Sequence, residues 1–139
     1  MFKLHSRLAE DCFQLGDFSL SRLLLMNDTN YPWFILVPRI PDISEIYHLS
    51  QTDQVQLSVE SSALSETIMR LFNGDKMNMA ALGNVVPQLH VHHVVRFKTD
   101  KAWPDPVWGK FAPVPYDQDG IDKLKARLVS AFPIEFALE

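Results

Sequence analysis

Several features that define whole classes of protein are missing from this sequence. A single cysteine, Cys12, excludes an intramolecular disulfide, so nothing favours an exported protein stabilised by disulfides. The chain has no run of Lys and Arg and a formal net charge of −4, which disfavours binding to a nucleic-acid backbone. No apolar stretch approaches the roughly 18 residues of a membrane span, and the N-terminal residues lack the apolar core of a signal peptide. We therefore expect a cytoplasmic protein that binds neither nucleic acid nor a membrane.

The composition that is present is typical of one soluble domain. The 139 residues are 47% hydrophobic and 22% charged, which predicts a single compact domain over residues 1–139. The helical spacing of Leu4, Leu8 and Cys12 predicts a short N-terminal helix that ends near Gly16. In this helix we expect Cys12 to be a packing residue rather than a nucleophile.

Apolar segments separated by turn signals predict the remaining elements. The turn signal at residues 27–32 joins two apolar strands in a hairpin, and Ser50 is expected to cap a long helix. The predicted helices cover residues 3–14, 51–72 and 120–131, and the predicted strands cover residues 18–26, 33–38, 76–82 and 88–97. Strands in hairpins with helices between them indicate an α+β fold with an antiparallel sheet of about five strands.

A cluster of histidines in the last predicted strand is the most informative feature of the sequence. Because side chains alternate along a strand, Gln88, His90, His92 and Arg96 are predicted to share one face, whereas His93 points to the other. Neighbours on one face lie roughly 6 to 7 Å apart, a spacing that suits several polar groups gripping one phosphate. A neutral imidazole is a good nucleophile for phosphorus, and a second histidine can bond phosphoryl oxygens or help protonate the leaving group.

Histidines on a strand also have structural and metal-binding roles. A lone histidine on a strand is usually structural, and we interpret His93 as a core or interface residue. A His-x-His pair can also supply two zinc ligands, but no third ligand is evident, because His5 and His48 are far away in the sequence and Cys12 is alone. We therefore expect no metal site.

Residues 88–95 resemble the motif of the histidine triad family, His-φ-His-φ-His-φ-φ on a strand, where φ is apolar. The segment departs from this motif twice: Gln88 replaces the first histidine, and His93 occupies an apolar position. Features elsewhere agree in order. Residues 23–28 followed by 34–39 resemble the family's early hairpin, and Asn78 followed by Gly83-Asn84 is similar to its Asn…Gly-Gln approach. The resemblance spans roughly residues 15 to 110.

The resemblance implies a fold, an activity and two catalytic residues. The fold would be an antiparallel sheet flanked by helices, paired through a two-fold axis into the continuous sheet of a homodimer. The activity would be hydrolysis of nucleoside phosphoramidates or dinucleoside polyphosphates, or nucleotidyl transfer, with no metal or cofactor. His90 would be the nucleophile that forms a covalent nucleotidyl-histidine intermediate, and His92 would contact phosphate.

The same resemblance implies the residues that bind the nucleotide. The family's ribose-binding residue maps onto Asn27 or Asp28, between which the sequence does not decide. Its phosphate-contacting asparagine maps onto Asn78, and Asn84 in the following loop completes the expected set. Trp103-Pro104 resembles a segment that reaches the active site in some members, although Trp103 and Trp108 are equally expected as loop anchors.

Two positions bear on how active the protein is. The amide of Gln88 carries no titrating proton, so from that position we expect a hydrogen bond that orients its neighbours rather than acid–base help. Val85 stands where the family often has Ser or Thr, so one hydroxyl contact to phosphate is missing. The leading hypothesis is a homodimeric hydrolase or nucleotidyl transferase that acts on a purine nucleotide or nucleotide conjugate. The alternative is a nucleotide-binding or sensor module with little turnover.

Overall fold

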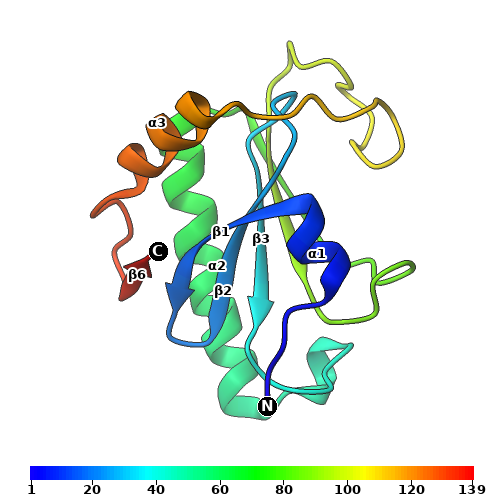
Figure 1. The fold of residues 1–139 in the computed structure, drawn as a ribbon, viewed down its shortest axis with the longest axis vertical. Coiled ribbons are helices and arrows are strands. Elements are labelled where there is room, and N and C mark those ends of the chain that lie inside the picture. The colour runs from blue at the N-terminus through cyan, green and yellow to red at the C-terminus, as the bar shows by residue number, and fades with distance from the viewer.

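The computed structural model describes residues 1–139 and contains one antiparallel sheet with helices on both faces (Figure 1). Its six strands lie in the order β4-β5-β3-β2-β1-β6. Their bounds are Cys12–Phe18 (β1), Ser21–Met26 (β2), Trp33–Pro38 (β3), Lys76–Ala80 (β4), Val91–Arg96 (β5) and Phe136–Leu138 (β6). The helices are Ser6–Asp11 (α1), Gln51–Phe72 (α2) and Gln118–Leu128 (α3), with a short 3-10 helix at Ile46–His48 (η1). The predicted α+β class with an antiparallel sheet is confirmed.

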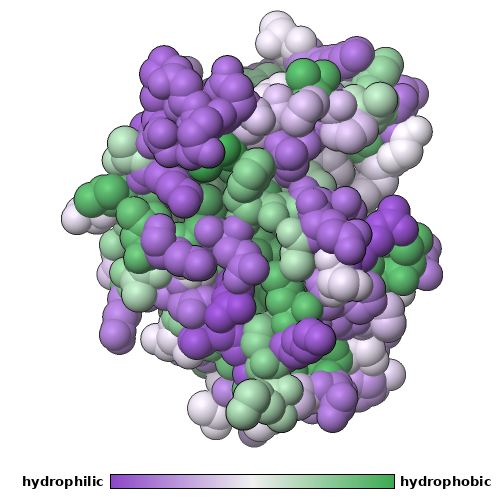
Figure 2. Space-filling view, viewed as in Figure 1, coloured by the Kyte–Doolittle hydropathy of each residue, from purple (hydrophilic) through white to green (hydrophobic).

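Each face of the sheet packs against its own hydrophobic cluster, because side chains alternate along the strands. The face that carries Phe34, here called the α2 face, packs against Leu64 of α2 and Leu124 of α3. The opposite face, here called the α1 face, carries Ile35 and packs against Leu8 of α1. Figure 1 shows α1 in front of the sheet and α2 behind it. From the same side, Figure 2 shows a band of hydrophobic residues running between hydrophilic flanks.

Two of the predicted elements agree closely with the structure. Helix α2 covers the predicted residues 51–72, and the side chain of Ser50 accepts a hydrogen bond from the backbone N–H of Asp53. Asn73 ends the helix in the left-handed conformation. Strands β2 and β3 form the predicted hairpin around residues 27–32. No helix in the chain combines the length and the apolarity that crossing a membrane requires.

The N-terminal region differs from the predicted helix over residues 3–14. Helix α1 ends at Asp11, and the chain continues into β1, which begins with Cys12 paired to Met26 of β2. Gly16 lies inside β1, where an added side chain would collide with the backbone of β6. Strand β1 pairs with β2, and its last residues pair also with the distant β6; this sheet pairing overrides the helical spacing that the local sequence suggests.

Cys12 has the packing role that was predicted, although it lies in a strand rather than in a helix. Its side chain belongs to the cluster on the α1 face. Burial, followed by the negative charge of Asp11, raises the pKa of the thiol to about 12. The thiol is therefore protonated at neutral pH, a state that is unfavourable for a nucleophile.

Candidate active site

A pocket of about 350 Å³ opens on the α1 face, and both His90 and His92 line it. Its walls come from α1, the end of β2, the loop between β4 and β5, and the loop after β5. The lining residues are Arg7, Leu8, Asp11, Met26, Leu82, Gly83, Asn84, Val85, Val86, His90, His92 and Trp108. This volume lies in the range of small-molecule sites. A larger groove of about 860 Å³ lies between α2 and β4 and contains neither histidine.

The ring of His90 is held in one tautomer by the backbone. Its Nδ1 lies 2.7 Å from the carbonyl oxygen of Gln88, and a carbonyl oxygen can only accept a hydrogen bond. The hydrogen of the neutral ring is therefore on Nδ1, and Nε2 has a free lone pair. The residue as a whole is 7% exposed. His90 thus lines the pocket with a nucleophilic nitrogen available.

His92 is held in the opposite tautomer by a tryptophan. The indole N–H of Trp33 donates a hydrogen bond to Nδ1 of His92 over 3.0 Å, so the hydrogen of the neutral imidazole is on Nε2. Burial, followed by the proximity of His90 and His93, lowers the pKa of His92 to about 3. The ring is neutral at pH 7 and keeps one N–H group free as a hydrogen-bond donor.

The two rings form a complementary pair. Their centroids are 4.9 Å apart, and the ring planes are inclined by 69°. Trp108 packs edge-on against His92, with 5.3 Å between ring centroids, and so closes one side of the pair. One imidazole offers a lone pair and its neighbour offers an N–H group. The lone pair can attack an electrophilic phosphorus, and the N–H group can donate a hydrogen bond to one of the phosphoryl oxygens.

His93 points to the α2 face, as the alternation predicted, and it is a core residue. Its Nδ1 donates to the carbonyl oxygen of Val91 over 3.0 Å, and its Nε2 accepts from the hydroxyl of Ser61 over 2.7 Å. Burial lowers the pKa of His93 to about 4, although the bond to Val91 acts in the opposite direction. The side chain is fully buried, and both of its nitrogens are occupied. No group of three His, Cys, Asp or Glu side chains in the chain is arranged to hold a metal ion.

Gln88 occupies a different position from the one that alternation predicted. Strand β5 begins only at Val91, so His90 and Gln88 both precede it. His90 still lines the pocket, but the alternation does not extend as far as Gln88. Its side-chain amide bonds to the backbone of Lys3 and His5 instead of facing the pair of histidines. Gln88 is not among the residues that line the pocket.

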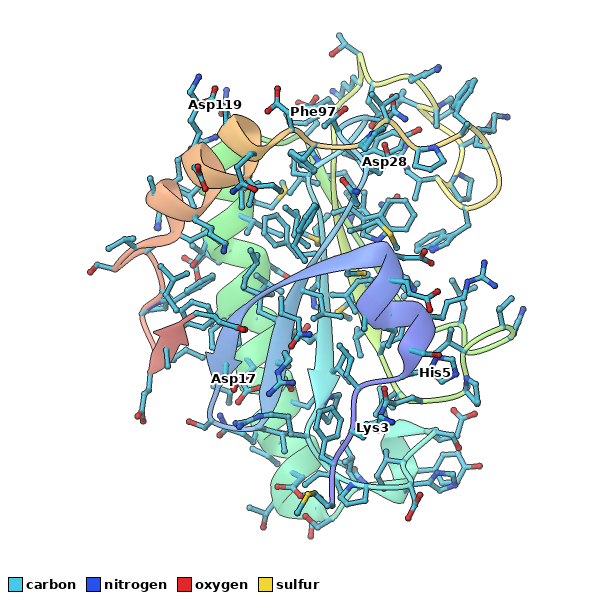
Figure 3. The ribbon with its side chains drawn as sticks, viewed as in Figure 1. Lys3, His5, Asp17, Asp28, Phe97 and Asp119 are labelled. Atoms are coloured by element: carbon cyan, nitrogen blue, oxygen red, sulfur yellow. The ribbon has the colours of Figure 1, made fainter.

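Asn27 and Asp28 lie outside the residues that line the pocket. The Oδ1 atom of Asn27 accepts from the backbone N–H of Tyr116 over 2.8 Å. The Oδ1 atom of Asp28 accepts from the N–H groups of Asn30 and Val114, over 2.9 and 3.2 Å. In Figure 3, Asp28 lies beside the segment that leads into α3. Both side chains therefore fix this segment, and contact of either one with ribose stays a prediction.

Asn78 is bound to a buried arginine that organises the loop after β5. Arg96 donates to Oδ1 of Asn78 over 2.8 Å and to both carboxylate oxygens of Asp100. Burial alone would raise the pKa of Asp100, but hydrogen bonds from Arg96 and from backbone N–H groups lower it. Trp103 packs on the Arg96 guanidinium, whereas Trp108 reaches the pocket. The family resemblance pointed to Trp103-Pro104 as the segment near the active site, but it is Trp108 that lines the pocket.

Several residues around the pocket could not be recognised from the sequence. Trp33 lies on the neighbouring strand β3 and holds the ring of His92 by a hydrogen bond. Ile35 pairs with His92, and Trp33 is two residues before Ile35, so Trp33 and His92 lie on the same face of the sheet. Arg7 and Asp11 line the pocket because α1 lies on the α1 face. The period-two pattern of β3 gives the face of Trp33, but only the strand order shows that β5 is its neighbour. Of the predicted nucleotide-binding residues, Asn84 alone lines the pocket.

Comparisons with known proteins identify a matching family and similar solved structures. The model of the HIT domain family matches residues 7–99. Three similar solved structures are histidine triad proteins from Marinobacter aquaeolei VT8, Bradyrhizobium japonicum and Sinorhizobium meliloti 1021. They are 57, 45 and 37% identical to this chain, with TM-scores of 0.93, 0.91 and 0.92. Each alignment covers 94% of this chain and 96, 97 and 97% of the respective relative. A search of curated proteins found no match.

Proposed function

Because this chain belongs to the histidine triad family, we propose that it is a nucleotide hydrolase or nucleotidyl transferase with His90 as its nucleophile. The family generally consists of nucleotide-binding hydrolases or transferases. The observation that carries the proposal is the opposite protonation of two neighbouring rings in one pocket. Nε2 of His90 has a free lone pair, and Nε2 of His92 carries a hydrogen.

In the first step of the proposed reaction, Nε2 of His90 attacks the phosphorus of a nucleoside phosphoramidate. A bond forms between Nε2 and phosphorus, the bond from phosphorus to the amine nitrogen breaks, and the amine takes up a proton from solvent. The free N–H of His92 donates to a phosphoryl oxygen, where negative charge develops. Because His92 is neutral, it acts as a hydrogen-bond donor rather than as the acid that protonates the amine.

In the second step, water attacks the phosphorus of the nucleotidyl-His90 intermediate. The bond to Nε2 breaks, a nucleoside monophosphate leaves, a proton passes to solvent, and the lone pair of His90 is restored. Attack by another acceptor in place of water gives nucleotidyl transfer from the same intermediate. With a dinucleoside polyphosphate the leaving group is a nucleoside polyphosphate, and the roles of His90 and His92 are unchanged.

The rest of the pocket offers groups that suit a bound nucleotide. Leu8, Met26 and Val86 offer an apolar wall for the base, and Arg7 and Asn84 are polar groups around it. Contact of Asn84 with the nucleotide is part of this proposal.

Turnover and binding measurements test the function directly. The purified protein is expected to release amine from an adenosine phosphoramidate, and to bind AMP or GMP in the presence of a chelator. The His90→Ala variant is the control for turnover. Binding without turnover would favour the alternative of a nucleotide-binding or sensor module. Failure to bind any purine nucleotide would overturn both.

We also propose that the protein is a homodimer. Strand β4 is at the edge of the sheet, with one side unpaired, and Met79 on it is 59% exposed. The 860 Å³ groove between β4 and α2 continues this surface, and Met79 also lines the groove. Two-fold pairing would cover the edge and the groove together. Light scattering at micromolar concentration is expected to give about twice the 15.9 kDa of one chain. A monomer mass would contradict the proposal.

A further inference from the structure

The side chain of Gln88 connects two segments that are far apart in the sequence. Its Oε1 accepts from the backbone N–H of His5 over 2.8 Å, and its Nε2 donates to the carbonyl oxygen of Lys3 over 2.9 Å. The amide therefore bonds to the N-terminal segment as a peptide group of a neighbouring strand would. We refer to this pair of bonds as the Gln88 clamp. Figure 3 shows Lys3 and His5 on the segment that leads into α1.

The clamp acts on the helix that forms one wall of the pocket. His5 is the N-cap of α1, and its Nδ1 accepts from the backbone N–H of Arg7. Arg7, Leu8 and Asp11 of this helix line the pocket that His90 and His92 also line. Helix α1 has only six residues, so its own hydrogen bonds hold it weakly, and its position depends on its anchors.

We propose that Gln88 is a positioning residue that fixes α1 against the pocket and thereby sets the affinity for the nucleotide. This inference rests on the proposed function. The amide suits the task because its donor and its acceptor point the same way, toward Lys3 and His5. A neutral imidazole has its donor and its acceptor on two separated ring nitrogens, so a histidine cannot reproduce the clamp.

Gln88 acts on the two sides of the pocket through different atoms. Its backbone carbonyl holds the tautomer of His90, and this bond persists whatever the side chain is. Its side chain holds α1. Substitution of the side chain therefore weakens binding of the nucleotide while the nucleophile stays aligned, which predicts a raised KM with kcat nearly unchanged.

Two variants separate the parts of the clamp. Gln88→Met keeps the length of the side chain and removes both hydrogen bonds. Gln88→Glu keeps the acceptor for the N–H of His5 and places a carboxylate against the carbonyl of Lys3. Gln118→Met is the matched control, because it removes a glutamine bond to Asp122 on the surface of α3. Each variant is measured for kcat and KM with an adenosine phosphoramidate, and for amide hydrogen exchange at His5, Arg7 and Leu8 by NMR.

In Gln88→Met we expect KM to rise about five- to tenfold, the effect of losing two modest hydrogen bonds, with kcat within about twofold. The amide of His5 is expected to exchange at least about tenfold faster in this variant. Gln88→Glu should raise KM at least as much as Gln88→Met, because its carboxylate repels the carbonyl oxygen of Lys3, and Gln118→Met should match wild type. A lower kcat at unchanged KM would overturn the proposal in favour of direct catalytic help from Gln88.

The exchange measurement distinguishes failure of this inference from failure of the proposed function. If the wild-type protein neither binds nor turns over nucleotides, the function and the role in affinity both fail, and exchange at His5 still decides whether the clamp holds α1. Unchanged exchange at His5 in Gln88→Met would overturn the clamp itself, whatever the activity.

Discussion

The two faces of strand β5 present adjacent histidines with a similar environment and different bonding. His92 on the α1 face and His93 on the α2 face are both buried. Burial lowers the pKa of both, to about 3 and about 4, so both rings are neutral near pH 7. Each also has a hydrogen bond that fixes its tautomer. Burial and pKa alone therefore do not distinguish the histidine that lines the pocket from the one in the core.

What differs is the second ring nitrogen. His93 uses both nitrogens, one on Val91 and one on Ser61, and nothing is left to meet a ligand. His92 and His90 each use Nδ1 alone, and each has an Nε2 that makes no hydrogen bond to the protein. The two nitrogens that are free beside the pocket are therefore the ones to which we assign the proposed function.

The largest effect is expected from the α1 face, where the His90→Ala variant removes the proposed nucleophile. Turnover of a nucleoside phosphoramidate should fall at least about 10³-fold, because the two-step route through the covalent intermediate is lost. Nucleotide affinity should stay within about tenfold of wild type, since the pocket walls are unchanged. Steady-state kinetics and calorimetric titration measure the two quantities. Retained turnover would show that another residue attacks phosphorus.

The pH dependence of stability tests the α2 face. A histidine in the unfolded chain has a pKa near 6.5, whereas the pKa of His93 in the folded protein is about 4. Between these two pH values the unfolded chain therefore binds a proton at His93 and the folded protein does not. Stability contributed by neutral His93 is therefore complete above pH 6.5 and is lost as the pH falls toward 4, by up to about 3 kcal/mol. Urea denaturation of wild type and His93→Gln across this range isolates the contribution. Parallel curves for the two proteins would contradict it.

A hydrophobic substitution on the α2 face sharpens the contrast at neutral pH. In His93→Leu the hydroxyl of Ser61 loses its bond to the ring, so the free energy of unfolding should fall by about 1 to 3 kcal/mol. The kcat value should stay within about threefold, because His93 contributes no atom to the pocket. Chemical denaturation and kinetics at pH 7 check this pair of results. A large loss of kcat in a stably folded variant would place His93 in the reaction.

The smallest effect is expected from Trp33→Phe, which removes the bond that sets the tautomer of His92. The N–H of His92 would no longer be held on Nε2, and kcat should fall by about tenfold, the scale of one hydrogen bond. Trp103→Phe is the matched control, because Trp103 packs on Arg96 away from the pocket. Equal kcat values for the two variants would show that the tautomer of His92 is unimportant.

The sequence predicted those features that depend on neighbouring residues. Alternation places His92 and His93 on opposite faces, and periodicity with the Ser50 cap predicts α2 from its first residue to its last. The family resemblance singled out His90 by its place in the motif, and the structure puts its ring beside that of His92.

Features that depend on distant residues could not be predicted. The bond from Trp33 to His92 joins residues 59 positions apart, and the Gln88 clamp spans 83 and 85 positions. Gln88 was predicted to share the face of His90 because the strand was expected to begin at residue 88, but it begins at Val91. An error of three residues in one boundary was enough to misplace a side chain.

The central claim is that His90 carries the nucleotide during turnover, and mass spectrometry of the trapped intermediate tests it most directly. Wild-type protein is mixed with a nucleoside phosphoramidate, quenched within milliseconds under conditions that preserve bonds between phosphorus and nitrogen, and digested. Nucleotidyl mass is expected on His90 of the wild-type protein and is expected to be absent from His90→Ala. An adduct on His92 or His93, or full turnover with no adduct at any time, would contradict it.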